Sequence, residues 1–214
     1  IRGGEVLERS RSLTTVVFDK TGTLTRGEPN VTDIVALAKF GEAELLRLAA
    51  SIEAGSEHPL GEVIVKNAKH RGMVLPEVKA FEAIPGHGIR GTVDGRAVLL
   101  GNRRLFAREG IDTKPAEETM MRLEQEGKTA MLIGADGALA GVIAVADTLK
   151  PEAKEAIAAL QNEGIEVVML SGDNRRTAEA IGRELGIAQV IAEVLPADKA
   201  KVIQDLQKQK KVVA

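Results

Sequence analysis

Short apolar runs alternate with segments of helical spacing at the two ends of the chain. The apolar runs are 13–18, 141–147, 165–173 and 188–194, and the helical segments are 150–164, 174–186 and 197–209. A last apolar run begins at residue 211. Because strands that alternate with helices form parallel sheets with right-handed crossovers, these parts together predict one α/β domain.

The middle of the chain follows a different pattern. Helical spacing predicts helices over 41–55, 56–72 and near 115–126, with Ser56 as N-cap of the second. Short apolar runs over 78–101 and on both sides of residue 136 are joined by turn signals, Asp94-Gly95 and Asp136-Gly137. This block predicts an antiparallel sheet with helices, inserted into the α/β domain. The polar stretch 25–30 is the expected linker or hinge.

Composition narrows the classes of function. The net charge is −2 and aromatic residues make up 2% of the chain, so neither a basic field nor stacking platforms favour nucleic acid as a partner. The absence of cysteine excludes disulfides and thiolate metal sites. No apolar run approaches the roughly 20 residues that span a bilayer, so the sequence predicts a soluble chain.

Polar clusters follow three of the predicted strands. They are Asp19-Lys20-Thr21-Gly22-Thr23, Asp147-Thr148-Leu149-Lys150 and Ser171-Gly172-Asp173-Asn174. Ligands of open α/β sheets bind beyond the carboxyl ends of the strands, so we expect the three clusters to converge on one edge. Taken singly, each is an ordinary turn, loop or helix cap. Three of them in order favour a site.

The first cluster has the chemistry of phosphoryl transfer. A carboxylate such as that of Asp19 can attack a phosphoryl group and form an acyl phosphate. The transferring group needs hydrogen-bond donors, which Thr21, Thr23 and Ser171 would supply, and a positive charge. Lys199 is our first candidate for that charge and Lys150 the second, although a single lysine at a helix start is most often only solvated.

Three groups of residues in the inserted block suit a nucleotide. Glu53 and His58 flank the junction of two helices, where a carboxylate can accept from an exocyclic amine and an imidazole can contact a purine. Gly86 and Gly88 would let the backbone approach a ribose or phosphate. Gly101-Asn102 ends an apolar strand. The alternatives are helix capping for His58 and tight turns for the glycine pairs.

The motifs resemble those of P-type ATPases. "DKTGTLT" at 19–25 matches their phosphorylation signature, Ser171-Gly172-Asp173 their "TGD", and "PADKAKVI" at 196–203 their lysine segment. "SEHPL" at 56–60 resembles the heavy-metal-transporting class, as do "GHG" at 86–88 and "GN" at 101–102. "SEHPL" is common in copper exporters, so the resemblance favours copper.

The resemblance implies an architecture and a set of roles. The fold would be a haloacid-dehalogenase-like phosphorylation domain, 1–30 and 143–214, with an inserted nucleotide-binding domain, 31–142. ATP and Mg²⁺ would be the cofactors, with Mg²⁺ on Asp19 and Thr21. The implied catalytic residues are Asp19, Lys20, Thr21, Ser171, Gly172, Asp173 and Lys199, and the implied ATP-binding residues are Glu53, His58, Gly86, Gly88, Gly101 and Asn102.

Two other functions compete with a metal pump. A soluble phosphatase of the same fold usually has a second aspartate two residues after the nucleophile, and this chain has Thr21 there. Without that acid and base, ADP still leaves readily, whereas hydrolysis of the acyl phosphate slows. A non-catalytic nucleotide-binding module would tolerate a damaged signature, and this signature is intact. The sequence therefore favours the pump.

Further expectations come from the family pattern. The family places a Mg²⁺-binding "GDGxND" segment soon after the last apolar run, and the sequence stops at Ala214 before it, so we expect a fragment of a larger membrane protein. The resemblance implies as partners the membrane-spanning and actuator domains of the same polypeptide, and metal-binding domains or a metallochaperone. It also implies a location on the cytoplasmic face of a membrane.

Overall fold

The computed structural model describes residues 12–37 and 39–214, and these form two compact units. Unit 1 combines the described residues up to Glu28 with Asp147–Ala214, and unit 2 is Pro29–Ala146. The division falls a few residues from the expected boundaries at 30/31 and 142/143. Within the described residues, no helix is both long enough and apolar enough to cross a bilayer.

Unit 1 is built on a parallel sheet, as the alternating pattern predicts. Its strands are β1 (Thr15–Asp19), β8 (Glu166–Leu170) and β9 (Gln189–Ile191), in the order β1-β8-β9. Its helices are α6 (Ala153–Asn162), α7 (Arg175–Leu185) and α8 (Lys199–Lys208). The register pairs Asp19 with Leu170, so β1 and β8 end together and both polar clusters follow at the same edge.

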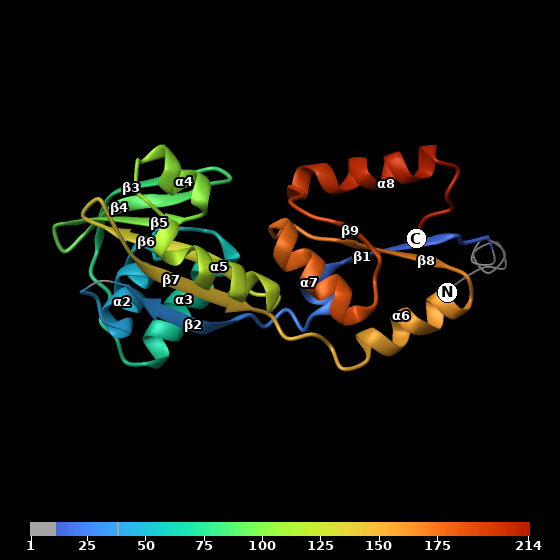
Figure 1. The fold of residues 1–214 in the computed structure, drawn as a ribbon, viewed down its shortest axis with the longest axis horizontal. Helices are drawn as coiled ribbons and strands as arrows, with labels where there is room; N and C mark the ends of the chain where they lie inside the picture. Colours follow the sequence, from blue (N-terminus) through green and yellow to red (C-terminus); the bar gives the residue numbers. More distant parts are fainter. Residues whose placement is uncertain (1–11, 38) are drawn as a thin grey trace. The chain divides into compact units, whose positions relative to one another are not determined.

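Aliphatic packing fixes the sheet of unit 1 in place. Ile157 of α6 and Ile181 and Leu185 of α7 form one buried cluster with Val167 and Met169 of β8. Figure 1 shows α8 on the opposite side of the sheet from α6. The last apolar run pairs in parallel with the free edge of β1, where the Val17 amide donates to the Ala214 carbonyl at 2.8 Å.

Unit 2 is built on an antiparallel sheet of the order β2-β7-β6-β5-β4-β3. The strands are β2 (Asn30–Ala36), β3 (Val78–Ile84), β4 (Gly88–Val93), β5 (Arg96–Gly101), β6 (Thr129–Ala135) and β7 (Ala138–Ala146). The helices are α2 (Glu42–Glu53), α3 (Pro59–His70), α4 (Arg103–Arg108) and α5 (Lys114–Gln125). Both expected turns, Asp94-Gly95 and Asp136-Gly137, join neighbouring strands.

Helices cover both faces of this sheet. On one face, buried residues of α2 and α3, such as Leu48 and Ile64, pack against Val98 of β5. On the other face, Phe106 of α4 and Leu123 of α5 belong to a second buried cluster. The sheet residues on each face therefore bury apolar surface against the helices on that face. Such burial is the main contribution to the stability of packed layers.

Several sequence predictions about strands and helices are wrong. The run 141–147 is not part of the parallel sheet, because it forms the second half of β7 in unit 2. Strand β7 lies between β2 and β6 with both faces covered, and such a strand has the continuous apolar run of a parallel strand. The prediction also missed β2 and the short helix α4. His58, rather than Ser56, is the N-cap of α3.

The chain segments that connect the units run side by side within unit 1. The Arg26 amide donates to the Thr148 carbonyl at 2.9 Å, and the Lys150 amide donates to the Leu24 carbonyl at 2.9 Å. The carboxylate of Asp147 accepts from the amides of Gly27 and Glu28, at 3.0 and 3.1 Å. Asp147 thus fixes the backbone of the expected linker. The expectation that the run 141–147 is a strand of the parallel sheet that ends in Asp147 is wrong.

Candidate active site

The loop after β1 presents the Asp19 carboxylate at the end of the parallel sheet. Residues Lys20–Leu24 make one irregular turn, with Gly22 at a φ of 76° that favours glycine. Thr25, which is fully buried, holds the turn closed. Its hydroxyl accepts from the Gly22 amide and donates to the Lys20 carbonyl, both at 3.1 Å. Sequence reasoning gave Thr25 no role, although it stands within the "DKTGTLT" string.

Lys199 meets Asp19 as the charge argument predicts. Its Nζ lies 2.8 Å from both Oδ1 and Oδ2 of Asp19, although 180 residues separate the two in sequence. Both side chains remain partly accessible, at 34% for Lys199 and 41% for Asp19. The pair is therefore a solvent-facing carboxylate with a cation beside it, and a substrate can reach both groups.

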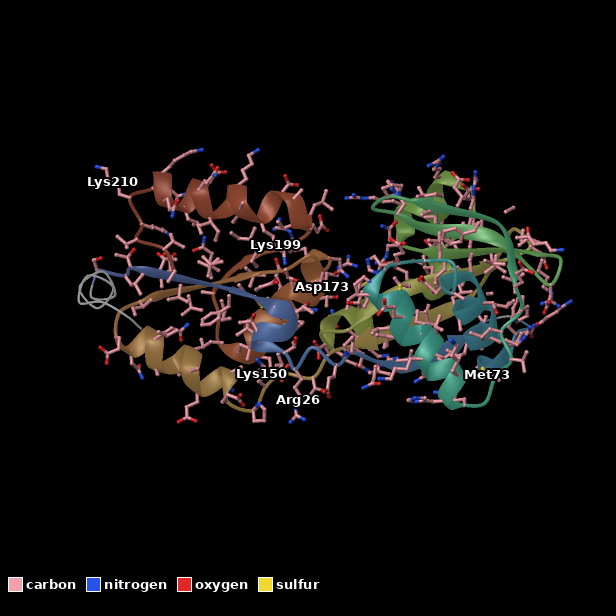
Figure 2. The ribbon with its side chains drawn as sticks, turned by 180° about the vertical axis from the view of Figure 1, so that it is seen from behind. Arg26, Met73, Lys150, Asp173, Lys199 and Lys210 are labelled. Atoms are coloured by element: carbon pink, nitrogen blue, oxygen red, sulfur yellow. The ribbon has the colours of Figure 1, made fainter. Side chains whose placement is uncertain are left out.

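Lys150, the second candidate for the positive charge, contacts the loop after β1 at a different position. Its Nζ donates to the Gly22 carbonyl at 3.1 Å, so it supports the loop. Figure 2 labels Lys199, Asp173 and Lys150 at the same end of unit 1, and Lys210 at the far end of α8. The structure thus collects the first and third polar clusters at one end of the sheet.

The cluster after β8 is held by its own side chains. Ser171 is 1% exposed. Its hydroxyl donates to Asp173 Oδ2 at 2.7 Å and accepts from the Asp173 amide at 3.1 Å. Lys20 points to the same carboxylate, with its Nζ 2.6 Å from Asp173 Oδ2. In this arrangement the Ser171 hydroxyl donates its proton to Asp173, whereas we expected it to donate to the phosphoryl group.

The residues around Asp19 suit a magnesium ion that is shared with a substrate phosphate. Mg²⁺ takes one or two carboxylates, phosphate oxygens and several waters. Asp19 supplies an accessible carboxylate, and Thr21 is exposed in an extended conformation next to it. Among the residues that the structure describes, no three His, Cys, Asp or Glu side chains gather as a metal cage. The donor set therefore fits a phosphate-bound ion better than a fully protein-bound one.

Glu53 is an unusual residue at the end of α2. Its side chain is buried, at 6% exposure, and its Oε2 has no hydrogen-bond partner. Burial raises the pKa of Glu53 to about 7, while a hydrogen bond with Ser56 acts in the opposite direction. Gly61 of α3 makes room for it, since a Cβ there would lie 2.2 Å from Oε2. A buried acceptor without a partner is destabilising, which favours a functional role.

His58 has the capping role that the alternative reading assigned to it. Its Nδ1 accepts from the Leu60 amide at 3.2 Å, and its ring is exposed. The Ser56 hydroxyl in turn accepts from the His58 amide at 3.1 Å. A ligand can therefore reach the ring while the backbone below it stays fixed.

The glycine pairs and Asn102 form a single locked structure. Asn102 Nδ2 donates to the Gly86 carbonyl at 2.9 Å, and its Oδ1 caps α4 by accepting from the amides of Arg104 and Leu105. A Cβ on Gly88 would lie 2.2 Å from the carbonyl oxygen of Leu100.

Gly101 is equally constrained, because its Cβ would lie 2.3 Å from the His87 carbonyl oxygen. Close backbone packing thus explains Gly88 and Gly101. Gly86 has a φ of 72° and open space around it. Among the hydrogen bonds and ion pairs of the described residues, none joins these glycines to Glu53 or His58. A cavity of about 320 Å³ near Arg90, Thr92 and Leu99 is lined by none of the six expected nucleotide residues.

Known proteins resemble the chain over its whole length. The copper-exporting P-type ATPase of Bacillus subtilis (strain 168) is 48% identical over 208 residues, which are 97% of this chain and 26% of the relative. The chain thus spans about a quarter of the length of the curated relatives it matches.

Solved structures agree with this likeness. A zinc-transporting PIB-type ATPase in an E2.Pi state matches with a TM-score of 0.70 and 38% identity, over 100% of this chain and 34% of that one. The catalytic domain of the CPx-ATPase CopB-B, described for its conformational changes upon nucleotide binding, matches with a TM-score of 0.68 and 28% identity, over 100% of this chain and 74% of that one.

A family model covers nearly the whole sequence. The model of the haloacid dehalogenase-like hydrolases matches residues 13–214, which include both units. The expected fold class is confirmed by this match, by the CopB-B likeness and by the two observed sheets. The chain belongs to the haloacid dehalogenase-like hydrolases.

Proposed function

We propose that this chain is the ATP-binding and phosphorylated catalytic part of a heavy-metal-transporting P-type ATPase, and that the metal is copper. The observation that carries the proposal is the accessible Asp19 carboxylate with Lys199 at 2.8 Å from both of its oxygens. The 48% identity with a copper-exporting P-type ATPase supports the choice of transporter and of metal.

The reaction assigns a separate task to each group around Asp19. An oxygen of Asp19 attacks the γ-phosphorus of ATP, the bond from that phosphorus to the bridging oxygen breaks, and ADP leaves with the electron pair. Lys199 moves from the free carboxylate to the phosphoryl oxygens and balances their charge. Bound Mg²⁺, held by Asp19, the Thr21 carbonyl and the phosphate, would neutralise part of the same charge.

Unit 2 is the proposed nucleotide-binding domain. Glu53 presents an unsatisfied buried acceptor, which suits the exocyclic amine of adenine, and His58 presents an exposed ring on a fixed helix start. The locked Gly86–Gly88 turn offers open space at Gly86 for a ribose or phosphate. Asn102 then acts on the nucleotide chiefly by holding this turn through the Gly86 carbonyl.

A soluble phosphatase is the second enzyme class for this fold. Position 21 favours the pump over it, because Thr21 lacks the carboxyl group that a phosphatase of this fold usually uses as acid and base. The acyl phosphate would therefore persist long enough to drive a conformational cycle. In the transporter, the chain would face the cytoplasm and work with ATP, with membrane-spanning and actuator domains of the same polypeptide, and with metal-binding domains or a metallochaperone.

The test is phosphorylation of the full-length, membrane-bound protein by γ-labelled ATP. Asp19→Asn should abolish an acid-stable, hydroxylamine-sensitive phosphoenzyme and leave ATP binding intact. Asp205→Asn is the matched control, since Asp205 is an exposed acid of unit 1 that pairs with Lys208 on α8. A phosphoenzyme that persists in Asp19→Asn would refute the assignment. Stimulation by Zn²⁺ but not by Cu⁺ would refute copper alone.

A further inference from the structure

Lys20 follows the candidate nucleophile directly in the sequence, yet its ammonium group forms an ion pair with Asp173. Its Nζ lies 2.6 Å from Asp173 Oδ2, and the side chains of Lys20 and Asp173 are only 11% and 12% exposed. Water screens such a pair much less than the Lys199–Asp19 pair, which is about three times as accessible. The fixed partner of Lys20 in this structure is therefore Asp173.

The oxygen that binds Lys20 also holds the Ser171 hydroxyl. Asp173 Oδ2 accepts from Ser171 Oγ at 2.7 Å, and this hydroxyl accepts from the Asp173 amide at 3.1 Å. A hydroxyl has one proton, so Ser171 cannot donate to Asp173 and to a phosphoryl group at once. Any donation to the substrate requires Asp173 to give up this hydrogen bond.

The backbone around this hydroxyl is fixed. The Ser171 amide donates to the Ile191 carbonyl at 2.9 Å, and the Val194 amide donates to the Ser171 carbonyl at 3.1 Å. The Glu193 amide donates to the Asp173 carbonyl at 2.9 Å, with Glu193 at a positive φ of 60°. Because the main chain is held on both sides, rotation of the Ser171 side chain is the cheapest way to redirect its proton.

We propose that Lys20 is a positioning residue whose ion pair with Asp173 lets the Ser171 hydroxyl turn from Asp173 to the phosphoryl group. When the hydroxyl turns away, Lys20 still compensates the Asp173 carboxylate, so no uncompensated charge is left in a nearly dry place. Lys20 also cancels a negative charge that would otherwise repel the arriving phosphate. This inference rests on the proposed phosphorylation of Asp19.

A double-mutant cycle on the full-length protein tests this role. Lys20→Met removes the charge, Asp173→Asn removes its partner, and the double variant removes both. We expect Lys20→Met to slow phosphoenzyme formation about tenfold or more, with ATP affinity unchanged, and Asp173→Asn in that background to restore a large part of the rate. A merely structural role would instead appear as a lowered melting temperature of Lys20→Met that the double variant restores, with the slower rate explained by the loss of folded protein.

The control variant loses another lysine–carboxylate pair of unit 1, with the same N–O distance and more exposed side chains. Lys211 pairs with Glu166 at 2.6 Å, and its neighbour Lys210 is labelled in Figure 2 at the end of α8 away from Lys199. Lys211→Met should leave the rate unchanged. Melting temperatures of all variants show whether each folds, and Lys20→Gln replaces Lys20→Met if the latter does not.

The outcomes separate this inference from the proposed function. If the wild-type protein forms no phosphoenzyme that Asp19→Asn lacks, the proposed function fails. If the wild type is phosphorylated and the folded Lys20 variant is phosphorylated at the same rate, the positioning role fails and the function stands. A slow double variant, no faster than Lys20→Met, would likewise overturn the role of the Asp173 charge.

Discussion

Glu53→Gln should make the chain more stable at neutral and alkaline pH. Glu53 is buried at the end of α2, and its Oε2 has no hydrogen-bond partner. Burial disfavours the ionised carboxylate and raises its pKa from 4.5 to about 7. The folded chain therefore keeps a proton on Glu53 over a range of pH in which the unfolded chain has already lost it.

The sign of the effect follows from proton linkage. Between pH 4.5 and about 7 the folded state binds more protons than the unfolded state, so the free energy of unfolding falls as pH rises through this window. At about 1.4 kcal/mol for each unit of pKa, the difference between 4.5 and about 7 corresponds to a loss of about 3 kcal/mol. Above about 7 the loss is complete and constant. Glutamine carries no titrating proton, so the variant avoids this loss.

Urea unfolding followed by circular dichroism at several pH values measures this difference. At about pH 8 we expect Glu53→Gln to exceed the wild type by about 3 kcal/mol, and at about pH 5 by only a small amount. Glu62→Gln, which removes an exposed acid in the first turn of α3, controls for the change of one formal charge.

The dependence of the free energy of unfolding on pH shows whether the reasoning is right. Wild-type and Glu53→Gln curves that run parallel from about pH 5 to 8 would show that Glu53 ionises in the folded chain as it does in the unfolded one. That outcome would refute the reasoning from burial, and with it the reason to treat Glu53 as a functional rather than a structural residue.

Further variants test the nucleotide site and its support. ATP binding near pH 7 should release a proton from Glu53 if adenine donates to it, so calorimetry in two buffers should show proton release in the wild type and none in Glu53→Gln. Gly88→Ala should destabilise the chain by about 2 kcal/mol or more in urea unfolding, because the new Cβ would lie 2.2 Å from a carbonyl oxygen of β5; an unchanged midpoint would contradict the close packing. Asn102→Ala should lose about 1–2 kcal/mol of stability with its cap and weaken ATP binding, whereas an effect on ATP alone would make it a direct ligand. Glu124→Gln should lower the melting temperature, since Glu124 is 2% exposed and pairs with Arg103, and an unchanged temperature would show the pair to be neutral.

Much of the fold follows from sequence pattern alone. The alternation of strands and helices predicted the parallel sheet of unit 1, and the turn signals at Asp94-Gly95 and Asp136-Gly137 predicted two hairpins of unit 2. The pattern failed at β7, because a strand covered on both faces has no alternation of polar and apolar positions. Helix α4 is only six residues long, and too short for its spacing to show.

The candidate site was predictable in its residues but not in its partners. Charge balance predicted a lysine beside Asp19, and the structure places Lys199 there. No sequence rule indicated that Lys20 turns to Asp173, since that pairing depends on the side-chain directions at the ends of β1 and β8. The roles of Gly88 and Gly101 likewise required the backbone, because only the strand pairing shows which carbonyl oxygen each glycine approaches.

Unit 2 is a self-contained insertion, which we call the cassette, because its two chain ends lie next to each other and so do the two ends of unit 1 that connect to it. In unit 2 the first and last strands lie side by side, with Asn30 opposite Ala146. In unit 1 the two ends that carry the cassette are joined by Asp147 and the amides of Gly27 and Glu28. Each unit therefore closes its own chain ends. In an ancestral gene, a coding segment for unit 2 could therefore be inserted into a single loop of unit 1 at little cost in loop-closure entropy. By the same reasoning, protein engineering could remove unit 2 or replace it with another domain.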